Sequence, residues 1–300
     1  MQRASERRVH TARRGLTTPV DPMRLVVAAF VFGVVALAPS VALADAAGPT
    51  DYESEVVAVM PDSEVIDVSI EGGDAFVRIE LEPGHEVIVL GYAPDSEPYL
   101  RIDADGTVEE NLRSFATYYN EERFGGTDIP DIVDNDAAPE WRRIGSGGAW
   151  SWHDHRAHWM GDEPPIGLEP GDSLPDQTID VLVDGEPVGV VVRTTLQPDP
   201  SPVPAIVGVL LGLQLGLLAF ALGPATSTMS VFVTGVAATV VGAGQYLSLS
   251  ASTGPLPTWW LLPLIAVVSS AVTIAIYGRS ELAQLVLLMV GGAMLLVWVV

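Results

Sequence analysis

The sequence predicts a mixed fold, in which an exported all-β domain is followed by a bundle of about four transmembrane helices. The β domain is expected to be an antiparallel sandwich of the immunoglobulin or cupredoxin kind. Three observations predict this: a basic and then apolar leader, a middle part with short alternating runs, and a final third almost free of charge. The expected parts are a signal peptide at residues 1–44, the β domain at 45–197, a linker at 198–204 and the membrane region at 205–300.

The first 44 residues follow the arrangement of a secretory signal peptide. Arginines up to Arg24 precede an unbroken apolar run over residues 25–37, and Ala42-Leu43-Ala44 supplies the small residues of a cleavage site. The apolar run is short for a helix that spans a bilayer. We therefore expect cleavage after Ala44, with residues 45–200 on the extracytoplasmic side of the cell membrane. A retained anchor, or a start at Met23, is the alternative.

The net charge of −23 belongs almost wholly to the β domain. Residues 45–200 hold 35 Asp and Glu against 8 Arg, and the chain contains no Lys. Binding of DNA or RNA requires clustered basic side chains that displace counterions from phosphates, so nucleic acid is not expected as a partner. The chain also contains no Cys, so the exported domain must be held together by its apolar core rather than by disulfides.

Short alternating runs predict the strands of the sandwich. Residues 65–70 and 76–81 alternate apolar and polar side chains on either side of a glycine-rich turn. A second hairpin is expected over residues 179–196, where Asp184-Gly185 can adopt the positive φ angles of a two-residue turn. Residues 103–136 are irregular and rich in Asn, Asp, Gly and Pro, so we expect long loops there.

One segment, residues 150–160, concentrates side chains that bind metal ions. It reads Trp-Ser-Trp-His-Asp-His-Arg-Ala-His-Trp-Met and holds three of the five histidines of the chain. If the segment is extended, His153 and His155 project to the same face, where both imidazoles can reach one metal ion. His158 would join them only through a turn after Ala157.

Two further side chains are candidate ligands. Met160 lies in the same segment, and His85 stands at a predicted turn. Imidazoles with a thioether and no thiolate suit copper, whereas three imidazoles with a water suit zinc. In the alternative interpretation Asp154 and Arg156 pair with each other, the histidines hydrogen-bond to the backbone, and the tryptophans fill the core or pack at the bilayer interface.

Three segments of the chain carry a resemblance to known sequences. They are Leu90-Gly91-Tyr92, Glu97-Pro98-Tyr99-Leu100-Arg101 and residues 150–160. With these segments the chain resembles an uncharacterised group of bacterial membrane proteins, mainly from high-GC actinobacteria, over most of residues 50–300. The resemblance implies a secreted β domain followed by C-terminal membrane helices. It implies no activity, because none is established for the group.

Four apolar stretches follow the proline-rich linker, which is too stiff and extended to join a helix or a sheet. Each is near the length that crosses the core of a bilayer, so lipid is an expected partner. They contain no charged side chain, which argues against a proton-coupled transporter. Arg279 lies between the last two, and the positive-inside tendency places it in the cytoplasm. The stretches are roughly residues 205–222, 229–247, 259–277 and 282–300.

Gly208, Gly212 and Gly216 recur every four residues on one face of the first apolar stretch. Glycines at this spacing let another helix backbone approach closely. We expect packing within the bundle, with a homo-oligomer or a membrane partner as the alternative use.

These observations favour a binding module over an enzyme. The first hypothesis is a membrane-anchored module that captures copper or zinc through His153, His155 and His158. The second is a structural or protein-interaction component of the cell envelope without a metal ion. A zinc hydrolase would need an open coordination position and a placed base, and the sequence indicates neither.

Overall fold

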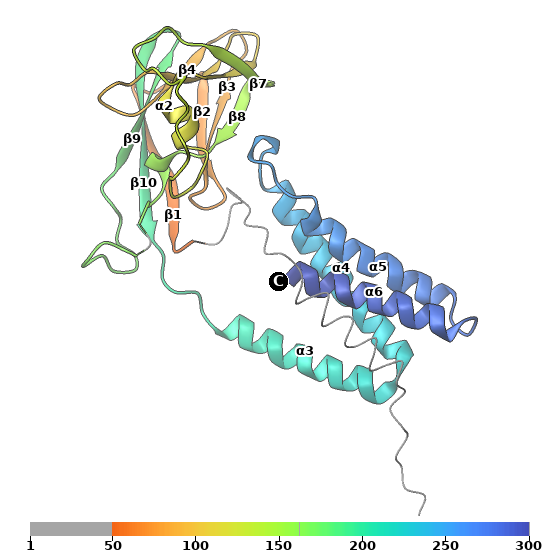
Figure 1. Ribbon diagram of the computed structural model, residues 1–300. Coiled ribbons are helices and arrows are strands. Elements are labelled where there is room, and N and C mark those ends of the chain that lie inside the picture. Colours follow the sequence, from red (N-terminus) through yellow and green to blue (C-terminus); the bar gives the residue numbers. More distant parts are fainter. Residues whose placement is uncertain (1–49, 162, 300) are drawn as a thin grey trace, which may run out of the picture.

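The computed structural model describes residues 50–161 and 163–299 (Figure 1). The expected signal peptide at residues 1–44 lies outside the described residues. In the described part, ten strands form the β domain and four long helices follow it. The prediction of an antiparallel β domain joined to a helical membrane region is confirmed.

Two antiparallel sheets make up the β domain. The larger has seven strands in the order β1-β10-β9-β4-β5-β6-β7, and the smaller has three in the order β2-β3-β8. The strands are β1 (Tyr52–Met60), β2 (Ile66–Glu71), β3 (Phe76–Leu81), β4 (Val87–Leu90), β5 (Pro98–Ile102), β6 (Thr107–Asn111), β7 (Trp141–Ser146), β8 (Ala149–Trp152), β9 (Gln177–Val183) and β10 (Glu186–Leu196).

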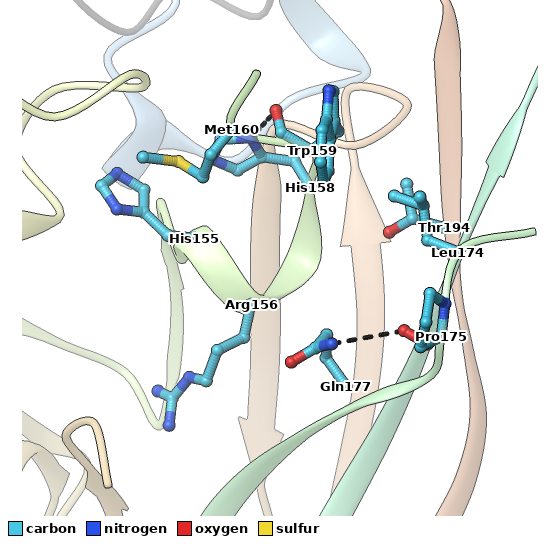
Figure 2. A pocket seen from close by; sticks show the side chains of 9 residues that line it. All are labelled: His155, Arg156, His158, Trp159, Met160, Leu174, Pro175, Gln177 and Thr194. Carbon is cyan, nitrogen blue, oxygen red and sulfur yellow. Dashed lines mark hydrogen bonds between the residues drawn. The ribbon is translucent and has the colours of Figure 1, made fainter. Parts of the chain in front are cut away.

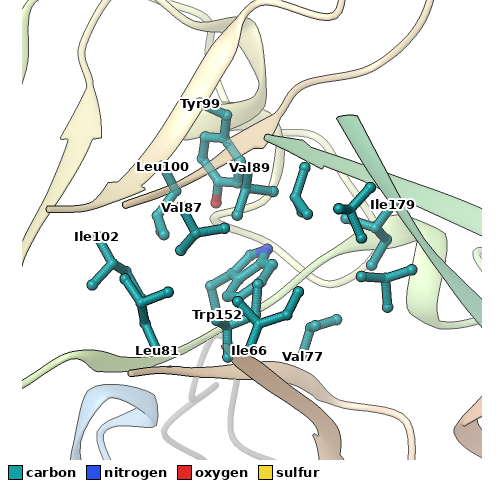
Figure 3. Close-up of a cluster of buried hydrophobic side chains, with 14 of the residues drawn as sticks. Ile66, Val77, Leu81, Val87, Val89, Tyr99, Leu100, Ile102, Trp152 and Ile179 are labelled. Atoms are coloured by element: carbon teal, nitrogen blue, oxygen red, sulfur yellow. The ribbon is translucent and has the colours of Figure 1, made fainter. Parts of the chain in front are cut away.

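The core of the domain lies between these two sheets (Figure 3). Val77 and Trp152 from the small sheet meet Val89 and Ile179 from the large one, and all four side chains are buried. The alternating sequence pattern explains this arrangement, because every second side chain of a strand points to the same face. Full burial of a side chain of this kind contributes about 1.5–3 kcal/mol.

Residues 103–136 are more regular than we expected. They contain β6 and the short helix α2 (Phe115–Tyr119), whose first turn is capped by the hydroxyl of Ser114. The remainder of the stretch is loop, and this loop reaches the histidines of residues 150–160 (described below).

The four helices of the membrane region are α3 (Val203–Leu222), α4 (Pro224–Leu247), α5 (Thr258–Ala275) and α6 (Glu281–Val299). Three of them, α4, α5 and α6, are long and apolar enough to cross a membrane, whereas α3 counts as a shorter apolar helix over Val203–Ala219. Helix α5 packs against both α4 and α6, and α3 packs against α4. Association with a membrane follows from these helices.

The helix glycines that pack closely lie in α4 and α6 and not in α3. Apart from the neighbouring turns of α3 itself, no described atom lies within 4 Å of the position that a Cβ would take at Gly208, Gly212 or Gly216. Our expectation that these glycines serve packing within the bundle is therefore wrong for the described residues, because α3 turns this face away from the other helices. Their use in a homo-oligomer stays a prediction. In α4, by contrast, a Cβ on Gly242 would stand 1.8 Å from the backbone oxygen of Trp259.

Gly242→Ala is expected to force α4 and α5 apart. Overpacking of this kind typically costs about 1–3 kcal/mol, and here the obstacle is backbone, which has little freedom to move. Gly244→Ala is the matched control, because a Cβ there meets nothing within 4 Å. Thermal unfolding of the full chain in detergent, followed by helical circular dichroism, should show a lower midpoint for Gly242→Ala alone. Equal midpoints for the two variants would contradict the close approach of α4 and α5.

The loop between α4 and α5 contacts the β domain. The backbone N–H of Ser151 in β8 donates to the hydroxyl of Ser252 at 3.0 Å, and the hydroxyl of Ser250 donates to Glu71 at 2.6 Å. This loop and the β domain therefore lie at the same end of the helices. The turn between α5 and α6, at the opposite end of α5, contains Arg279; Figure 1 shows this turn away from the β domain.

Candidate metal site

Three histidines of residues 150–160 lie together inside the β domain. His153, His155 and His158, which we call the histidine cluster, are 6%, 7% and 6% exposed. One ring nitrogen from each lies within 4.8 Å of those of the other two, and the Nε2 atoms of His153 and His158 are 2.9 Å apart. No second group of this kind occurs among residues 50–161 and 163–299.

A tight turn, rather than a continuous strand, brings the histidines together. Strand β8 ends at Trp152, and the 3₁₀ helix η1 (His155–Ala157) follows after two residues. The expectation of an extended segment through His155 with a turn after Ala157 is thus wrong, because the turn comes earlier. It reverses the chain so that His158 returns to His153.

A buried ion pair fixes this turn. The carboxylate of Asp154 accepts hydrogen bonds from the backbone N–H of Arg156 at 3.0 Å, from its guanidinium at 2.9 and 2.8 Å, and from Nε1 of Trp152 at 3.1 Å. Arg156 also donates to the backbone oxygens of Leu90 and Gly91. Complete burial acts to raise the pKa of Asp154, but Arg156 outweighs it and holds the pKa below its ordinary value. Asp154 therefore acts as the N-cap that starts η1.

Each histidine of the cluster contacts a backbone carbonyl with its second ring nitrogen. A carbonyl oxygen can only accept a hydrogen bond, so each of these nitrogens carries a proton. In the neutral ring the lone pair is then left on Nε2 of His153, Nδ1 of His155 and Nε2 of His158. The contacts are His153 Nδ1 to Ala75 at 2.8 Å, His155 Nε2 to Glu122 at 2.8 Å and His158 Nδ1 to Trp159 at 2.9 Å.

One ring nitrogen from each histidine lies within 4.8 Å of those of the other two. The nitrogens with lone pairs carry no proton to donate to one another. Nδ1 of His155 is buried and has no hydrogen-bond partner among the described residues. The Nε2 atoms of His153 and His158 face each other, although with these tautomers neither donates to the other. A metal ion accepts lone pairs from neutral imidazoles, and histidines that bind metals commonly donate their other N–H to a carbonyl in this way. The donor set therefore suits a metal ion.

Burial keeps the histidine cluster neutral. Desolvation lowers the pKa of His153 to about 4 and that of His158 to about 3, and it also lowers the pKa of His155. The positive charge of Arg123 acts in the same direction on all three rings. Neutral imidazole is the form that binds a metal ion, and burial keeps all three rings in this form at neutral pH.

A second buried ion pair joins two of the segments whose carbonyls hold the cluster. Asp74 precedes Ala75, and Arg123 follows Glu122. The guanidinium of Arg123 lies 2.6 Å from the carboxylate of Asp74, which is completely buried. This pair thereby links the turn between β2 and β3 to the loop after α2, on opposite sides of the histidines.

A cavity of about 200 Å³ opens beside the cluster (Figure 2). Met160, His155 and His158 line it, and Figure 2 shows the thioether of Met160 extending toward the ring of His155. His85, the other candidate ligand, lies elsewhere: its Nδ1 is 2.7 Å from the carboxylate of Asp184 at the surface. The structure thus brings Met160 to the cluster and leaves His85 outside it.

Sequence reasoning missed the residues that surround the ligands. Asp74 stands in a glycine-rich turn, and Arg123 stands in an irregular acidic stretch. Arg123 offered one signal, because it is the only basic residue between Arg113 and Arg142. The backbone carbonyls that fix the tautomers leave no signal in the sequence, since every residue has one.

Chemically, the three histidines could hold a metal ion through neutral nitrogen donors, and the adjoining cavity has room for a further donor. Because a fold alone does not define a function, the chemistry of these residues carries the functional argument. Comparisons with protein-family models, with curated proteins and with solved structures gave no match.

Proposed function

We propose that this protein is a membrane-anchored, extracytoplasmic module that captures a copper or zinc ion through the histidine cluster. The convergence of three buried lone pairs carries the proposal, because the second nitrogen of each ring already meets a carbonyl. Such a set is prepared for a metal ion before the ion arrives, so little ordering is needed on binding.

The leader and the membrane region support capture outside the cytoplasm. The signal-like sequence of residues 1–44 favours export of the β domain. The loop between α4 and α5 lies at the same end of the helices as this domain, and the turn that contains Arg279 lies at the other end. The positive-inside tendency then favours a cytoplasmic position for Arg279 and an extracytoplasmic one for the β domain.

The alternative is a structural or interaction domain in which the histidines only fill space. Two features weigh against it. A buried polar atom without a hydrogen bond costs about 1–3 kcal/mol, which applies to Nδ1 of His155. The facing nitrogens of His153 and His158 add a second unfavourable contact in the absence of an ion. An apolar side chain of similar volume would avoid both penalties.

Metal binding by the full chain in detergent tests the proposal. Equilibrium dialysis against copper or zinc, with a competing chelator to remove weakly bound ions, should leave one equivalent on the wild-type chain. Changing all three histidines of the cluster to Ala should abolish this binding. His85→Ala is the matched control and should retain it, because His85 contacts Asp184 and not the cluster.

Retention of one equivalent by the triple variant would contradict the proposal. The 38 carboxylates of this chain would then be the source of binding. Failure of the folded wild-type chain to hold either ion would favour the interaction domain instead.

A further inference from the structure

We infer that the ion held by the histidine cluster is monovalent copper, with the thioether of Met160 as its fourth donor. This inference rests on the proposed function and selects among the ions that three imidazoles can bind. Two features of the site carry it: the absence of charge on its ligands and the donor that the adjoining cavity supplies.

The ligands supply no negative charge. All three imidazoles are neutral, and the two nearby buried carboxylates are each already paired with an arginine, Asp154 with Arg156 and Asp74 with Arg123. An ion in the cluster therefore keeps its full charge inside the protein. Because the cost of burying a charge rises with its square, a divalent ion pays about four times the desolvation cost of a monovalent one.

The cavity beside the cluster offers a soft donor, the thioether of Met160. Met160 lines it together with two of the ligand histidines, and its thioether extends toward His155 (Figure 2). Among the residues that the structure describes, no Asp or Glu lines this cavity. Thioether and imidazole donors select Cu(I), whereas carboxylate and water select harder divalent ions.

Aromatic rings pack against two of the histidines. The ring of Tyr119 packs edge-on against His155 with centroids 4.4 Å apart, and Phe124 packs edge-on against His158 at 6.5 Å. Neither ring offers an oxygen or nitrogen ligand of its own on the face that it turns to these histidines. Cu(I) is satisfied by few ligands, which fits a site of three imidazoles and one thioether.

Competition titrations of the full chain in detergent test the inference. Cu(I) is supplied under anaerobic, reducing conditions against a chromophoric Cu(I) chelator, and Zn(II) is titrated against a chromophoric zinc chelator. We expect tighter binding of Cu(I). Met160→Leu should weaken Cu(I) binding at least about tenfold and leave Zn(II) affinity unchanged, since even loss of a group that only orients a ligand weakens metal binding about 10–100-fold.

Met60→Leu is the matched control, because Met60 is exposed at the end of β1 and does not line the cavity. Leucine is close to methionine in volume, so neither variant should affect folding. Tighter binding of Zn(II), or equal Cu(I) affinities for wild type and Met160→Leu, would overturn the inference. Either result leaves the proposed function standing if binding still requires the histidine cluster, whereas the absence of any bound ion removes both.

Discussion

Asp154→Ala is expected to destabilise the β domain by about 3–5 kcal/mol, the range measured when one partner of a buried ion pair is removed. Asp154 is completely buried and binds Arg156 through three hydrogen bonds. Without it the guanidinium of Arg156 stays buried with no counter-charge, and η1 loses its N-cap. Thermal unfolding of the full chain in detergent, followed by near-ultraviolet circular dichroism, measures the effect.

Asp176→Ala is the control for this prediction. Asp176 contacts Arg193 through two hydrogen bonds of 2.9 and 2.8 Å, so the pair has similar geometry, but both side chains are exposed. Water screens such a pair, and its loss should change the unfolding midpoint little. Similar midpoints for the two variants would mean that Asp154 does not hold the turn. Asp154→Ala is also expected to weaken metal binding, because the turn that Asp154 caps positions His158 against His153.

Acidification is expected to destabilise the metal-free protein between about pH 6.5 and pH 4. In the unfolded chain His153 and His158 have a pKa of 6.5, whereas in the folded chain burial lowers it to about 4 and about 3. Above pH 6.5 both states hold neutral rings, so stability is at its full value. As the pH falls, the unfolded chain binds protons that the folded chain does not, and stability declines.

The magnitude follows from the size of these shifts. One pKa unit corresponds to about 1.4 kcal/mol, so the loss should reach several kcal/mol. Unfolding midpoints measured in denaturant at a series of pH values check this, with the His153→Gln, His158→Gln double variant as the comparison. The double variant should show a flatter profile across this window. A wild-type profile that is equally flat would show that the two rings are not buried as neutral groups.

The two-part fold could be predicted because each part leaves its own burial pattern in the sequence. Alternation at residues 76–81 and the uncharged runs after residue 204 report directly on what faces the core or the lipid. The strands β7 and β8 left a weaker signal, since Gly145, Gly147 and Gly148 interrupt any alternation there. A local sequence pattern therefore predicts an element well when one face of that element is consistently buried.

The candidate site shows the limit of that reasoning. The residue types were predicted, but the turn at His155 was not. Asp154 caps η1 instead of continuing the strand, and the buried ion pair with Arg156 stabilises this cap. The carbonyls of Ala75 and Glu122 come from segments far away in the chain, so the tautomers of the histidines depend on tertiary contacts. The same holds for His85, which the fold places beside Asp184.

X-ray absorption at the metal edge tests the central claim most directly, because an acidic chain can also hold ions on its surface. The sample is the full chain in detergent with one equivalent of the ion that it binds more tightly. The account predicts scattering from imidazole nitrogens at about 2.0–2.1 Å, with the imidazole pattern lost when the histidine cluster is changed to Ala. A shell of oxygen atoms alone, unchanged in that variant, would place the ion on surface carboxylates and contradict the account.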